Sequence, residues 1–566
     1  MELSAKRGIQ KIILALEKLG LKEVVICPGS RNSPLTISFN RHPSFVCTSI
    51  RDERSAAFYA LGKALSLQQP VAVVCTSGSA ALNFAPAVVE AYYQRVPLIL
   101  ITADRPKEWT DQGDGQTINQ THIYQNYIRK SYELRGEIQT VDDAWYNARC
   151  LSEGFTIAQF RDMGPVHFNI PLREPLYELA ETKLAEPSVF VESKTEVRLS
   201  SRSLESFHKQ FKSTRKVLVL IGQHRADERL QRLLAKISTF ENVVVLTEST
   251  SNMHHPDFVE HIDRCITHLQ EEEATALRPE ILITFGGAIV SKRIKSFLRQ
   301  AKLKNHWNVH PFDSYMDTYQ ALSHAVPMTA QAFLQQVVDD LSAPKSDYKE
   351  KWQLLKGEMQ TSHNVFCREI RFSDFYFFNT FFKKIPENIQ LHLSNSSPIR
   401  YMQLFEHDHI SQTWCNRGTS GIDGSTSTAM GISSALPEKE HLLVTGDVAF
   451  YYDINALWNE ERIENLKIIL INNGGGSIFR IIPGPDRVEE RTRFLETAMK
   501  SSADKIAQHY DWRYFAARNK EELEKAFSTF FQKSTKRAIL EVFTDPETNP
   551  EVLTEYWESL KENKHA

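Results

Sequence analysis

The sequence predicts an α/β protein with three doubly wound, parallel-sheet domains. Its 566 residues suit three or four domains of roughly 150 residues each. Short runs of Val, Ile and Leu, apolar at every position, alternate with longer helical stretches, and such strands are typical of a parallel sheet buried on both faces. The alternation restarts twice, so we expect domains at residues 1–185, 200–345 and 365–566.

The first block, residues 1–185, contains four strand-like runs: KEVVICPG, PVAVVCTSG, PLILITADRP and GPVHFNIP. Helical patterns lie between them at residues 53–67 and 79–94. The N-terminal stretch MELSAKRGIQKIILALEKLG has charges scattered among its apolar positions, so it predicts an amphipathic first helix and no signal or transit peptide.

A charged linker at residues 181–203 leads to the second block, whose strand-like runs are KVLVLIG, NVVVLTEST, EILITFGG and HWNVHP. This block has no GxGxxG, so a bound dinucleotide is not expected there. A polar helix is predicted at residues 342–360, before the third block.

The third block has the strand-like runs NIQLHLSNS, HLLVTGD, LKIILINN and RAILEVF, with a helix predicted at residues 453–465. As in the first block, Gly, Ser, Asp and Asn follow the strands. Ligands of open α/β sheets collect at the carboxyl ends of strands. We therefore expect the first and third blocks to form one composite site.

Composition excludes several classes of protein. The net charge of −3 and the pI near 6.7 disfavour a dedicated nucleic-acid binder. The seven cysteines are odd in number and contain no CxxC, so neither a disulfide framework nor a zinc site is indicated. No run reaches the roughly 18 apolar residues that a membrane span needs. We expect a cytoplasmic protein.

Two polar positions in the third block predict a metal site. Asp447 follows one apolar run, and Asn473 ends the next, fewer than thirty residues later, just before three glycines. Strands of one βαβ unit lie side by side or one apart, so these side chains can converge. Carboxylate and amide oxygens suit Mg²⁺, Mn²⁺ or Ca²⁺. The alternative is two turn residues that bind their own backbone.

This spacing resembles the motif of thiamin-diphosphate enzymes, in which GD is followed within thirty residues by NN. Val448 departs from the glycine usual in the family. The resemblance implies that Asp447, Asn473 and the Gly475 carbonyl hold Mg²⁺ or Mn²⁺ on the diphosphate of the cofactor. It also implies that Ile422 shapes the bound cofactor. The cofactor-binding residues implied by the family are Glu53, Ser394, Ser396, Ser420, Gly421, Ile422, Gly446, Asp447, Asn473, Gly475, Gly476 and Ile478.

Glu53 lies in TSIRDERSAAFYALG, where a strand-like run turns into a helix. One interpretation is an acid at a helix start that, with Asp52, interacts favourably with the helix dipole. The family resemblance implies another, a catalytic carboxylate that binds N1′ of the aminopyrimidine and promotes its imino tautomer. The blocks would then be an N-terminal pyrimidine-binding domain, a central domain and a C-terminal diphosphate-binding domain.

Further motifs resemble one branch of that family, the 2-succinyl-5-enolpyruvyl-6-hydroxy-3-cyclohexene-1-carboxylate (SEPHCHC) synthases of menaquinone biosynthesis, the MenD family. They are CPGSRNSPLT, ITADRP, GDGQTINQ, GPVHFNIPLREPLY, SNSSPIR and NRGTSGIDG. The resemblance implies a transferase that decarboxylates 2-oxoglutarate, with the cofactor as electron sink, and adds the succinyl carbanion equivalent to isochorismate.

Both implied substrates are dicarboxylates, so we expect a cation-rich site. Guanidinium groups suit carboxylates because they bind in a planar, bidentate fork. The residues that the resemblance places against substrate or in catalysis are Arg31, Arg105, Arg400, Arg417, Lys292, Ser30, Asn32, Gln116, Ile478 and Phe479. Any one arginine could instead make a surface ion pair, and Arg293 and Lys295 beside Lys292 could form a solvated face.

Two alternative functions remain open. One is another thiamin-diphosphate enzyme, such as an acetohydroxyacid synthase or a 2-oxo acid decarboxylase, although pyruvate-type substrates need fewer cations. The other is a non-catalytic nucleotide-binding or regulatory protein, which Glu53 together with the metal pair disfavours. The family resemblance implies a homodimer or homotetramer with active sites at the subunit interface.

Overall fold

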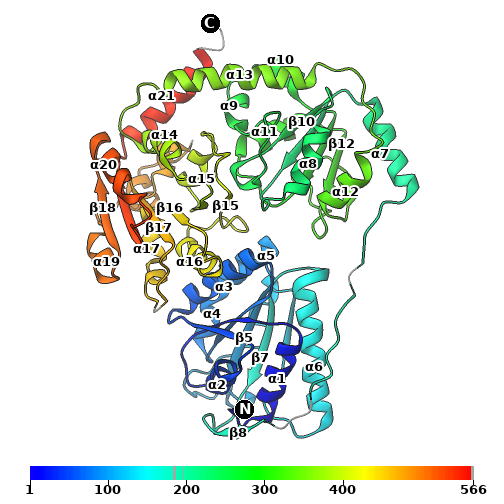
Figure 1. The fold of residues 1–566 in the computed structure, drawn as a ribbon, viewed down its shortest axis with the longest axis vertical. Helices are drawn as coiled ribbons and strands as arrows, with labels where there is room; N and C mark the ends of the chain where they lie inside the picture. The colour runs from blue at the N-terminus through cyan, green and yellow to red at the C-terminus, as the bar shows by residue number, and fades with distance from the viewer. Residues whose placement is uncertain (183–185, 194, 460, 483, 563–566) are drawn as a thin grey trace. The chain divides into compact units, whose positions relative to one another are not determined.

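The computed structural model describes residues 1–182, 186–193, 195–459, 461–482 and 484–562 (Figure 1). The chain divides into two compact units. The N-terminal unit comprises residues 1–194, 416–440 and 449–466, and the C-terminal unit comprises residues 195–415, 441–448 and 467–566.

The N-terminal unit contains a six-stranded parallel sheet of order β3-β2-β4-β5-β7-β6. Its strands are β2 (Glu23–Ile26), β3 (Val46–Ser49), β4 (Val71–Cys75), β5 (Leu98–Asp104), β6 (Lys130–Glu133) and β7 (Val166–Pro171). A short antiparallel pair, β1 (Glu2–Ser4) and β8 (Leu179–Glu181), joins the two ends of this part of the chain. This pair was not predicted, because each strand has only three residues and so shows no strand pattern.

Helices cover the sheet of the N-terminal unit. They are α1 (Arg7–Lys18), α2 (Ser33–Arg41), α3 (Glu53–Leu67), α4 (Ser79–Asn83), α5 (Ala85–Gln94), α6 (Val141–Thr156) and α16 (Ser425–Ala435). Apolar side chains of α1, α2 and α6 share one core with alternate residues of the strands. Helix α3 contacts β2, β4 and α5.

Helices α3 and α16 cross at very close range. A Cβ added to Gly431 would lie 2.0 Å from the Tyr59 carbonyl oxygen, and one added to Gly62 would lie 2.2 Å from that of Thr428. Only glycine fits at these two positions. Most residues of α3 are buried. The close crossing therefore holds this helix, and with it the position of its first residue, Glu53.

The C-terminal unit contains two further sheets. The first has the order β10-β9-β11-β12-β13, and all its strand pairs are parallel. Its strands are β9 (Val217–Ile221), β10 (Val243–Leu246), β11 (Ile281–Phe285), β12 (Asn305–Val309) and β13 (Leu322–Val326). Its helices are α7 (Ser201–Ser213), α8 (Glu228–Ile237), α9 (Ile262–Ile266), α10 (Glu271–Leu277), α11 (Lys292–Gln300) and α12 (Ala330–Val337).

The second sheet of this unit has the order β15-β14-β16-β17-β19-β18. Its strands are β14 (Gln390–Leu393), β15 (Gln412–Trp414), β16 (His441–Gly446), β17 (Leu466–Asn472), β18 (Arg513–Ala517) and β19 (Ala538–Phe543). The helices that accompany it are α13 (Tyr348–Phe366), α14 (Asp374–Lys384), α15 (Ser397–Met402), α17 (Asp447–Tyr452), α18 (Ile478–Ile481), α19 (Asp504–His509), α20 (Lys520–Phe530) and α21 (Thr548–Glu562). Five phenylalanines of α14 are buried in the core.

The predicted α/β class with parallel sheets is confirmed, and each strand-like run contains a strand. The helix predicted at 453–465 is wrong. Helix α17 starts earlier, at Asp447, and among residues 453–459 and 461–465 the structure has only a 3-10 turn, Ile454–Leu457. The physical reason is Asp453, whose buried carboxylate accepts hydrogen bonds from the Ser427 backbone N–H and hydroxyl, both at 2.7 Å. This anchor breaks the helix where the sequence pattern would continue it.

In the described part of the chain, no helix combines the length and apolarity needed to cross a bilayer. All seven cysteines lie in described residues, and no disulfide joins them. The linker residues 186–193 and 195–200 form neither helix nor strand.

Candidate active site

The C-terminal unit brings Asp447 and Asn473 together. β16 and β17 are neighbours in the sheet, and these two residues follow their last positions. The Asp447 carboxylate is 2% exposed and accepts hydrogen bonds from the backbone N–H of Val448 at 2.7 Å and of Gly475 at 2.8 Å. One carboxylate therefore ties the end of β16 to the glycine turn after β17.

Asp447, Asn473 and the Gly475 carbonyl, together called the clamp, have oxygen atoms that suit a hard divalent cation. Burial raises the pKa of Asp447 to about 7, so the carboxylate lacks a compensating positive charge in its surroundings. Gly475 has φ +129°, and a Cβ there would lie 2.6 Å from the Glu496 carbonyl oxygen, so the turn requires glycine. A carboxylate, an amide oxygen and a backbone carbonyl are the ligand types that Mg²⁺ and Mn²⁺ take.

Asp374 orients the amide of Asn473, and sequence analysis missed it. Its buried carboxylate accepts hydrogen bonds from Asn473 Nδ2 at 2.8 Å and from the Thr544 hydroxyl at 2.6 Å. Because the amide nitrogen is committed to Asp374, the amide oxygen is the atom available to a cation. Burial raises the pKa of Asp374. Asp374 is 99 residues away in sequence, and only its place at the start of a helix marks it.

Ser394, Ser396 and Arg400 lie at the same edge of the sheet. Ser394 is fully buried after β14, and its hydroxyl accepts the Gly446 N–H at 3.3 Å. Ser396 has φ +75°, unusual for a non-glycine residue. Arg400 on α15 donates to the Ser396 carbonyl at 2.6 Å. The strained turn thus places hydroxyl groups and a cation beside the clamp.

Ile478 and Phe479 begin α18, directly after the glycine turn, and both are partly exposed. The preceding Gly476 donates its backbone N–H to the Glu496 carbonyl at 2.6 Å. The buried Glu496 carboxylate pairs with Arg480 at 2.8 Å and with Arg491 at 2.9 Å. Glu496, which the sequence did not reveal, therefore holds the segment that carries Gly476, Ile478 and Phe479.

Glu53 is the first residue of α3 in the N-terminal unit. The cap of this helix is Asp52, whose side chain accepts the Ser55 N–H at 3.0 Å. The Asn455 amide also donates to Asp52, at 2.6 Å. Glu53 is therefore not needed as the cap. It is half-buried, and burial raises its pKa, with Asp52 adding to the effect.

Arg31 and Arg105 form a pair of neighbouring cations in the N-terminal unit. Arg31 is 5% exposed and donates to the Leu172 carbonyl at 2.9 Å. Arg105 donates to the Gly115 carbonyl at 3.1 Å. The pKa of Arg31 is lowered by burial first and then by the charge of Arg105, although Glu174 pairs with Arg31 at 3.1 Å. Among the described residues, neither Nε has a hydrogen-bond partner. This pair is suited to an anionic ligand.

Ser30, Asn32 and Gln116 lie on the turns around these arginines. Asn32 is fully buried and donates to the Cys27 carbonyl at 2.8 Å, which fixes the turn after β2. The Ser30 hydroxyl lies 3.1 Å from that of Tyr177. Gln116 has φ +54° and an exposed side chain, and its backbone passes so close to Gly78 that a Cβ there would lie 3.2 Å from it.

Glu90 on α5 holds the loop that contains Arg417, Ser420, Gly421 and Ile422. Its buried carboxylate accepts three hydrogen bonds at 2.7 Å, from the N–H groups of residues 418 and 419 and from the hydroxyl of residue 419. Sequence analysis missed this residue, since a glutamate in APAVVEAYYQ looks like any exposed helical acid. The loop belongs to the N-terminal unit, although its sequence lies in the third block.

Lys292 is the exposed first residue of α11 in the C-terminal unit. Its neighbours are engaged elsewhere: the Arg293 guanidinium lies 3.9 Å from the centre of the Trp557 ring, and Lys295 donates to the Ile289 carbonyl at 2.8 Å. The partly buried Asp263 is near both Arg293 and Arg400, because the charge of each lowers the pKa of Asp263 against the larger effect of burial. Of the three basic residues, Lys292 is therefore the one directed to solvent.

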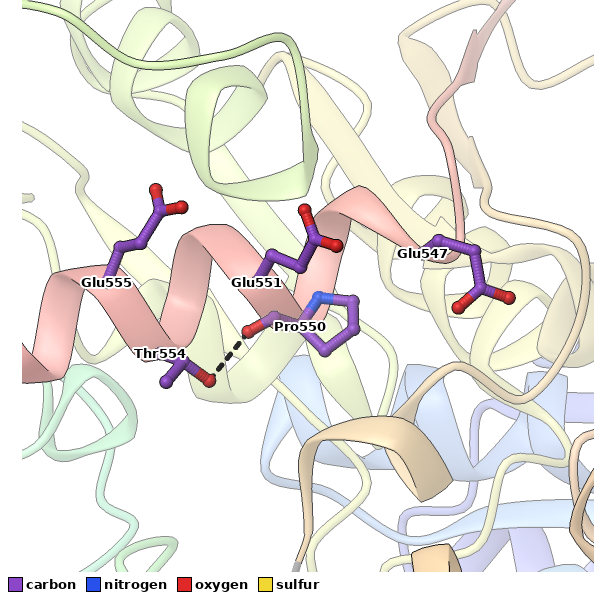
Figure 2. Close-up of a pocket in the computed structure, with 5 residues that line it drawn as sticks. All are labelled: Glu547, Pro550, Glu551, Thr554 and Glu555. Carbon is purple, nitrogen blue, oxygen red and sulfur yellow. Dashed lines mark hydrogen bonds between the residues drawn. The ribbon is translucent and has the colours of Figure 1, made fainter.

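A hollow beside α21 does not resemble a substrate site. Its lining residues are Glu547, Pro550, Glu551, Thr554 and Glu555, shown in Figure 2. Its carboxylates are already neutralised: Arg371 pairs with Glu551 at 2.8 Å and with Glu555 at 2.6 Å, and Arg480 pairs with Glu547.

The predicted site residues are divided between the two units. The C-terminal unit contains the metal clamp with Ser394, Ser396, Gly446, Gly476, Ile478, Phe479, Arg400 and Lys292. The N-terminal unit contains Glu53 with Ser30, Arg31, Asn32, Arg105, Gln116, Arg417, Ser420, Gly421 and Ile422.

Comparisons with known proteins agree with this chemistry. Three family models match: the N-terminal TPP binding domain of thiamine pyrophosphate enzymes at residues 6–123, their middle domain at 189–393 and their C-terminal TPP binding domain at 397–542. Thiamine pyrophosphate is another name for thiamin diphosphate.

Curated relatives match over nearly the whole chain. A SEPHCHC synthase of Flavobacterium psychrophilum is 42% identical over 97% of this chain and 98% of its own length. Those of Porphyromonas gingivalis and Bacteroides thetaiotaomicron are 38% and 36% identical, over 98% and 99% of this chain and 97% and 100% of their own lengths. The chain therefore belongs to the 2-succinyl-5-enolpyruvyl-6-hydroxy-3-cyclohexene-1-carboxylate synthase family of thiamine pyrophosphate enzymes.

Proposed function

We propose that this protein decarboxylates 2-oxoglutarate and adds the resulting succinyl group to isochorismate, giving SEPHCHC in menaquinone biosynthesis. The observation that carries the proposal is the oxygen clamp of Asp447, Asn473 and Gly475 in a chain that also pairs Arg31 with Arg105. The clamp accounts for a metal-bound diphosphate, and the arginine pair accounts for dicarboxylate substrates.

The geometry of the C-terminal unit supports a set of residues for the metal and the diphosphate of the cofactor. Asp447, Asn473 and the Gly475 carbonyl would hold Mg²⁺ or Mn²⁺, and Ser394 and Ser396 lie at the same sheet edge for the diphosphate. Bound thiamin diphosphate supplies the electron sink that decarboxylation needs. The remaining contacts to the cofactor fall to Ser420, Gly421, Ile422, Gly446, Gly476 and Ile478.

Glu53 holds the proton that activates the cofactor. Its carboxyl group is half-buried and its pKa is raised by burial, so it shares a proton with a ring nitrogen more readily than an exposed glutamate does. Asp52 performs the capping of α3, so Glu53 can point its carboxyl group at N1′ of the aminopyrimidine without loss of the helix start.

The basic residues orient the two dicarboxylates. Arg31 and Arg105 bind one carboxylate through their guanidinium groups, whose planar forks suit carboxylate oxygens. The other substrate carboxylates are bound by Arg400, Arg417 and Lys292. The polar contacts are completed by Ser30, Asn32 and Gln116. Water is excluded by Ile478 and Phe479. A low-polarity wall favours decarboxylation, because the negative charge disperses as CO₂ leaves.

Product formation tests this proposal against the nearest alternative, a pyruvate-dependent synthase or decarboxylase. The protein is supplied with thiamin diphosphate, Mg²⁺, 2-oxoglutarate and isochorismate, and SEPHCHC is measured by mass spectrometry. We expect the adduct, and no turnover of pyruvate in a parallel assay. Consumption of pyruvate without formation of the adduct would overturn the assignment.

We also propose that the chain works in the cytoplasm as a homodimer or homotetramer, with small dicarboxylates as its other partners. The support is membership of a family in which the active site lies at a subunit interface. There, the glutamate equivalent to Glu53 comes from one subunit and the metal ligands come from the other. Light scattering coupled to size-exclusion chromatography distinguishes the two assemblies from a monomer. A catalytically active monomer would contradict the proposal.

A further inference from the structure

Three side chains that the proposed reaction does not use meet in the C-terminal unit. His254 and Glu260 lie between β10 and α9, and His407 lies between α15 and β15. Each offers a metal-ligating atom, and these atoms all lie within 4.8 Å of one another. The rings of His254 and His407 are 5.2 Å apart between centres. The cluster therefore joins the segments around the two sheets of this unit.

His407 has a nitrogen that no described residue satisfies. Its side chain is 1% exposed, and Nδ1 lies 2.8 Å from the Phe405 carbonyl oxygen. A carbonyl only accepts, so Nδ1 carries the hydrogen and donates it. The other nitrogen, Nε2, is buried without a hydrogen-bond partner in the described structure. A proton on it would be a buried donor without an acceptor, so the ring is neutral and Nε2 offers a lone pair.

This arrangement is the one that metal-binding histidines adopt. A ligating histidine usually donates its second ring N–H to a backbone carbonyl or carboxylate, which fixes its tautomer. Here, Nδ1 of His407 donates to the Phe405 carbonyl, which leaves Nε2 for an ion. Nδ1 of His254 lies 3.2 Å from Glu260 Oε2, so an ion could be bound between these two atoms. The side chains of His254 and Glu260 are 21% and 17% exposed, which gives an ion a path from solvent.

We propose that His254, Glu260 and His407 form a structural Zn²⁺ site that cross-links the middle and C-terminal parts of the C-terminal unit. Two imidazoles and one carboxylate suit Zn²⁺ better than Mg²⁺, which takes oxygen ligands. In a tetrahedral zinc site, ligand atoms are about 3.4 Å apart, and rotation of the two partly exposed side chains supplies the approach of up to about 1.4 Å. Water takes the fourth position. The site is independent of the proposed reaction.

Metal analysis tests the site on the full-length protein without a polyhistidine tag. The protein is stripped with a chelator and then saturated with thiamin diphosphate and Mg²⁺, so that the clamp at Asp447 does not compete for zinc. After incubation with ZnCl₂ and gel filtration, we expect one Zn²⁺ per chain and a higher melting temperature. Chain-bound zinc well below one equivalent would overturn the proposal.

Variants locate the ion. His407→Gln and Glu260→Gln are expected to weaken Zn²⁺ binding at least a hundredfold, whereas the neighbouring His255→Gln binds it like the wild type. Equal affinity in His407→Gln and the wild type would refute the site. If the variants fail to fold, Co²⁺ added to the wild-type protein decides: four-coordinate Co²⁺ with nitrogen ligands gives intense visible bands, and a spectrum of hexaaqua Co²⁺ would refute the site.

Discussion

At the scale of single residues, hydrogen-bond geometry separates the roles of two neighbouring acids. Asp52 and Glu53 are adjacent acids at one helix start, yet only Asp52 accepts the capping hydrogen bond from Ser55. The helix therefore needs the first acid, and the second remains available for the cofactor. The different roles of these two acids follow from their different hydrogen bonds.

Glu53→Gln is expected to lower kcat by roughly 10²–10⁴-fold, the usual contribution of a positioned acid or base. Glutamine has the same shape but cannot exchange a proton in this way, and the helix cap is retained, so circular dichroism stays native. Steady-state assays of SEPHCHC formation measure the effect. Asp52→Asn, which keeps a capping side chain, is the matched control. A native rate in Glu53→Gln would remove this residue from the mechanism.

Asp447 predicts a pH dependence of the metal-free protein. Its folded pKa is about 7, against 3.8 in the unfolded chain. Between these values the folded state binds more protons, so the free energy of unfolding falls as pH rises from about 4 to 7, by a few kcal/mol in total. Asp447→Asn lacks this slope, and Mg²⁺ removes it by favouring the charged form. Urea unfolding between pH 5 and 8 measures the free energy of unfolding of the metal-free wild type and of Asp447→Asn. The same pH dependence in these two proteins would contradict the prediction.

At the scale of secondary-structure elements, two contacts hold the site segments in place. Glu90 on α5 anchors the loop at residues 416–424, and glycines let α3 and α16 cross closely. Neither contact touches the reacting atoms. Both are positioning features, and each has a separate test.

Glu90→Gln is expected to lower kcat/KM by about 10–100-fold, because a misplaced loop shifts Arg417 from its substrate. An amide cannot accept all three hydrogen bonds that the carboxylate accepts. The readout that separates positioning from folding is the KM of the dicarboxylates, which should rise while the melting temperature falls only slightly. Unchanged kinetics would show that the loop holds its place without Glu90.

Gly431→Ala is expected to lower the free energy of unfolding by about 1–3 kcal/mol, because its Cβ would lie 2.0 Å from the Tyr59 carbonyl oxygen. The control is Gly357→Ala on α13, where a Cβ would meet no atom within 4 Å and helix propensity favours alanine by about 1 kcal/mol. Chemical denaturation compares the two variants. Equal effects would contradict the close crossing.

At the scale of the whole molecule, the site residues are divided between two compact units, each with its own core. Ligands that bind only the folded protein stabilise it by mass action. The complex of Mg²⁺ with thiamin diphosphate, at about 100 times its dissociation constant, is expected to add about 2.7 kcal/mol. Removal of metal with EDTA should reverse the gain. Calorimetry measures it, and the same gain in Asp447→Asn would argue against the clamp.

The sequence by itself determined the strands that are apolar at every position, the start of α3 and the Asp447–Asn473 pair. Buried parallel strands need runs that are apolar at every position, and many helix starts use a capping side chain such as Asp52, so both features are local in the chain. The same locality explains the false helix at 453–465, since the pattern does not reveal that Asp453 bonds Ser427.

Only the tertiary structure decided which distant polar residues support the site. Asp374, Glu90 and Glu496 resemble ordinary acids in sequence, and their roles arise from hydrogen bonds across the fold. The cluster of His254, Glu260 and His407 likewise has no sequence spacing typical of a metal site. A buried polar group must find its partner in space, and that partner is set by how strands and helices pack, not by distance along the chain.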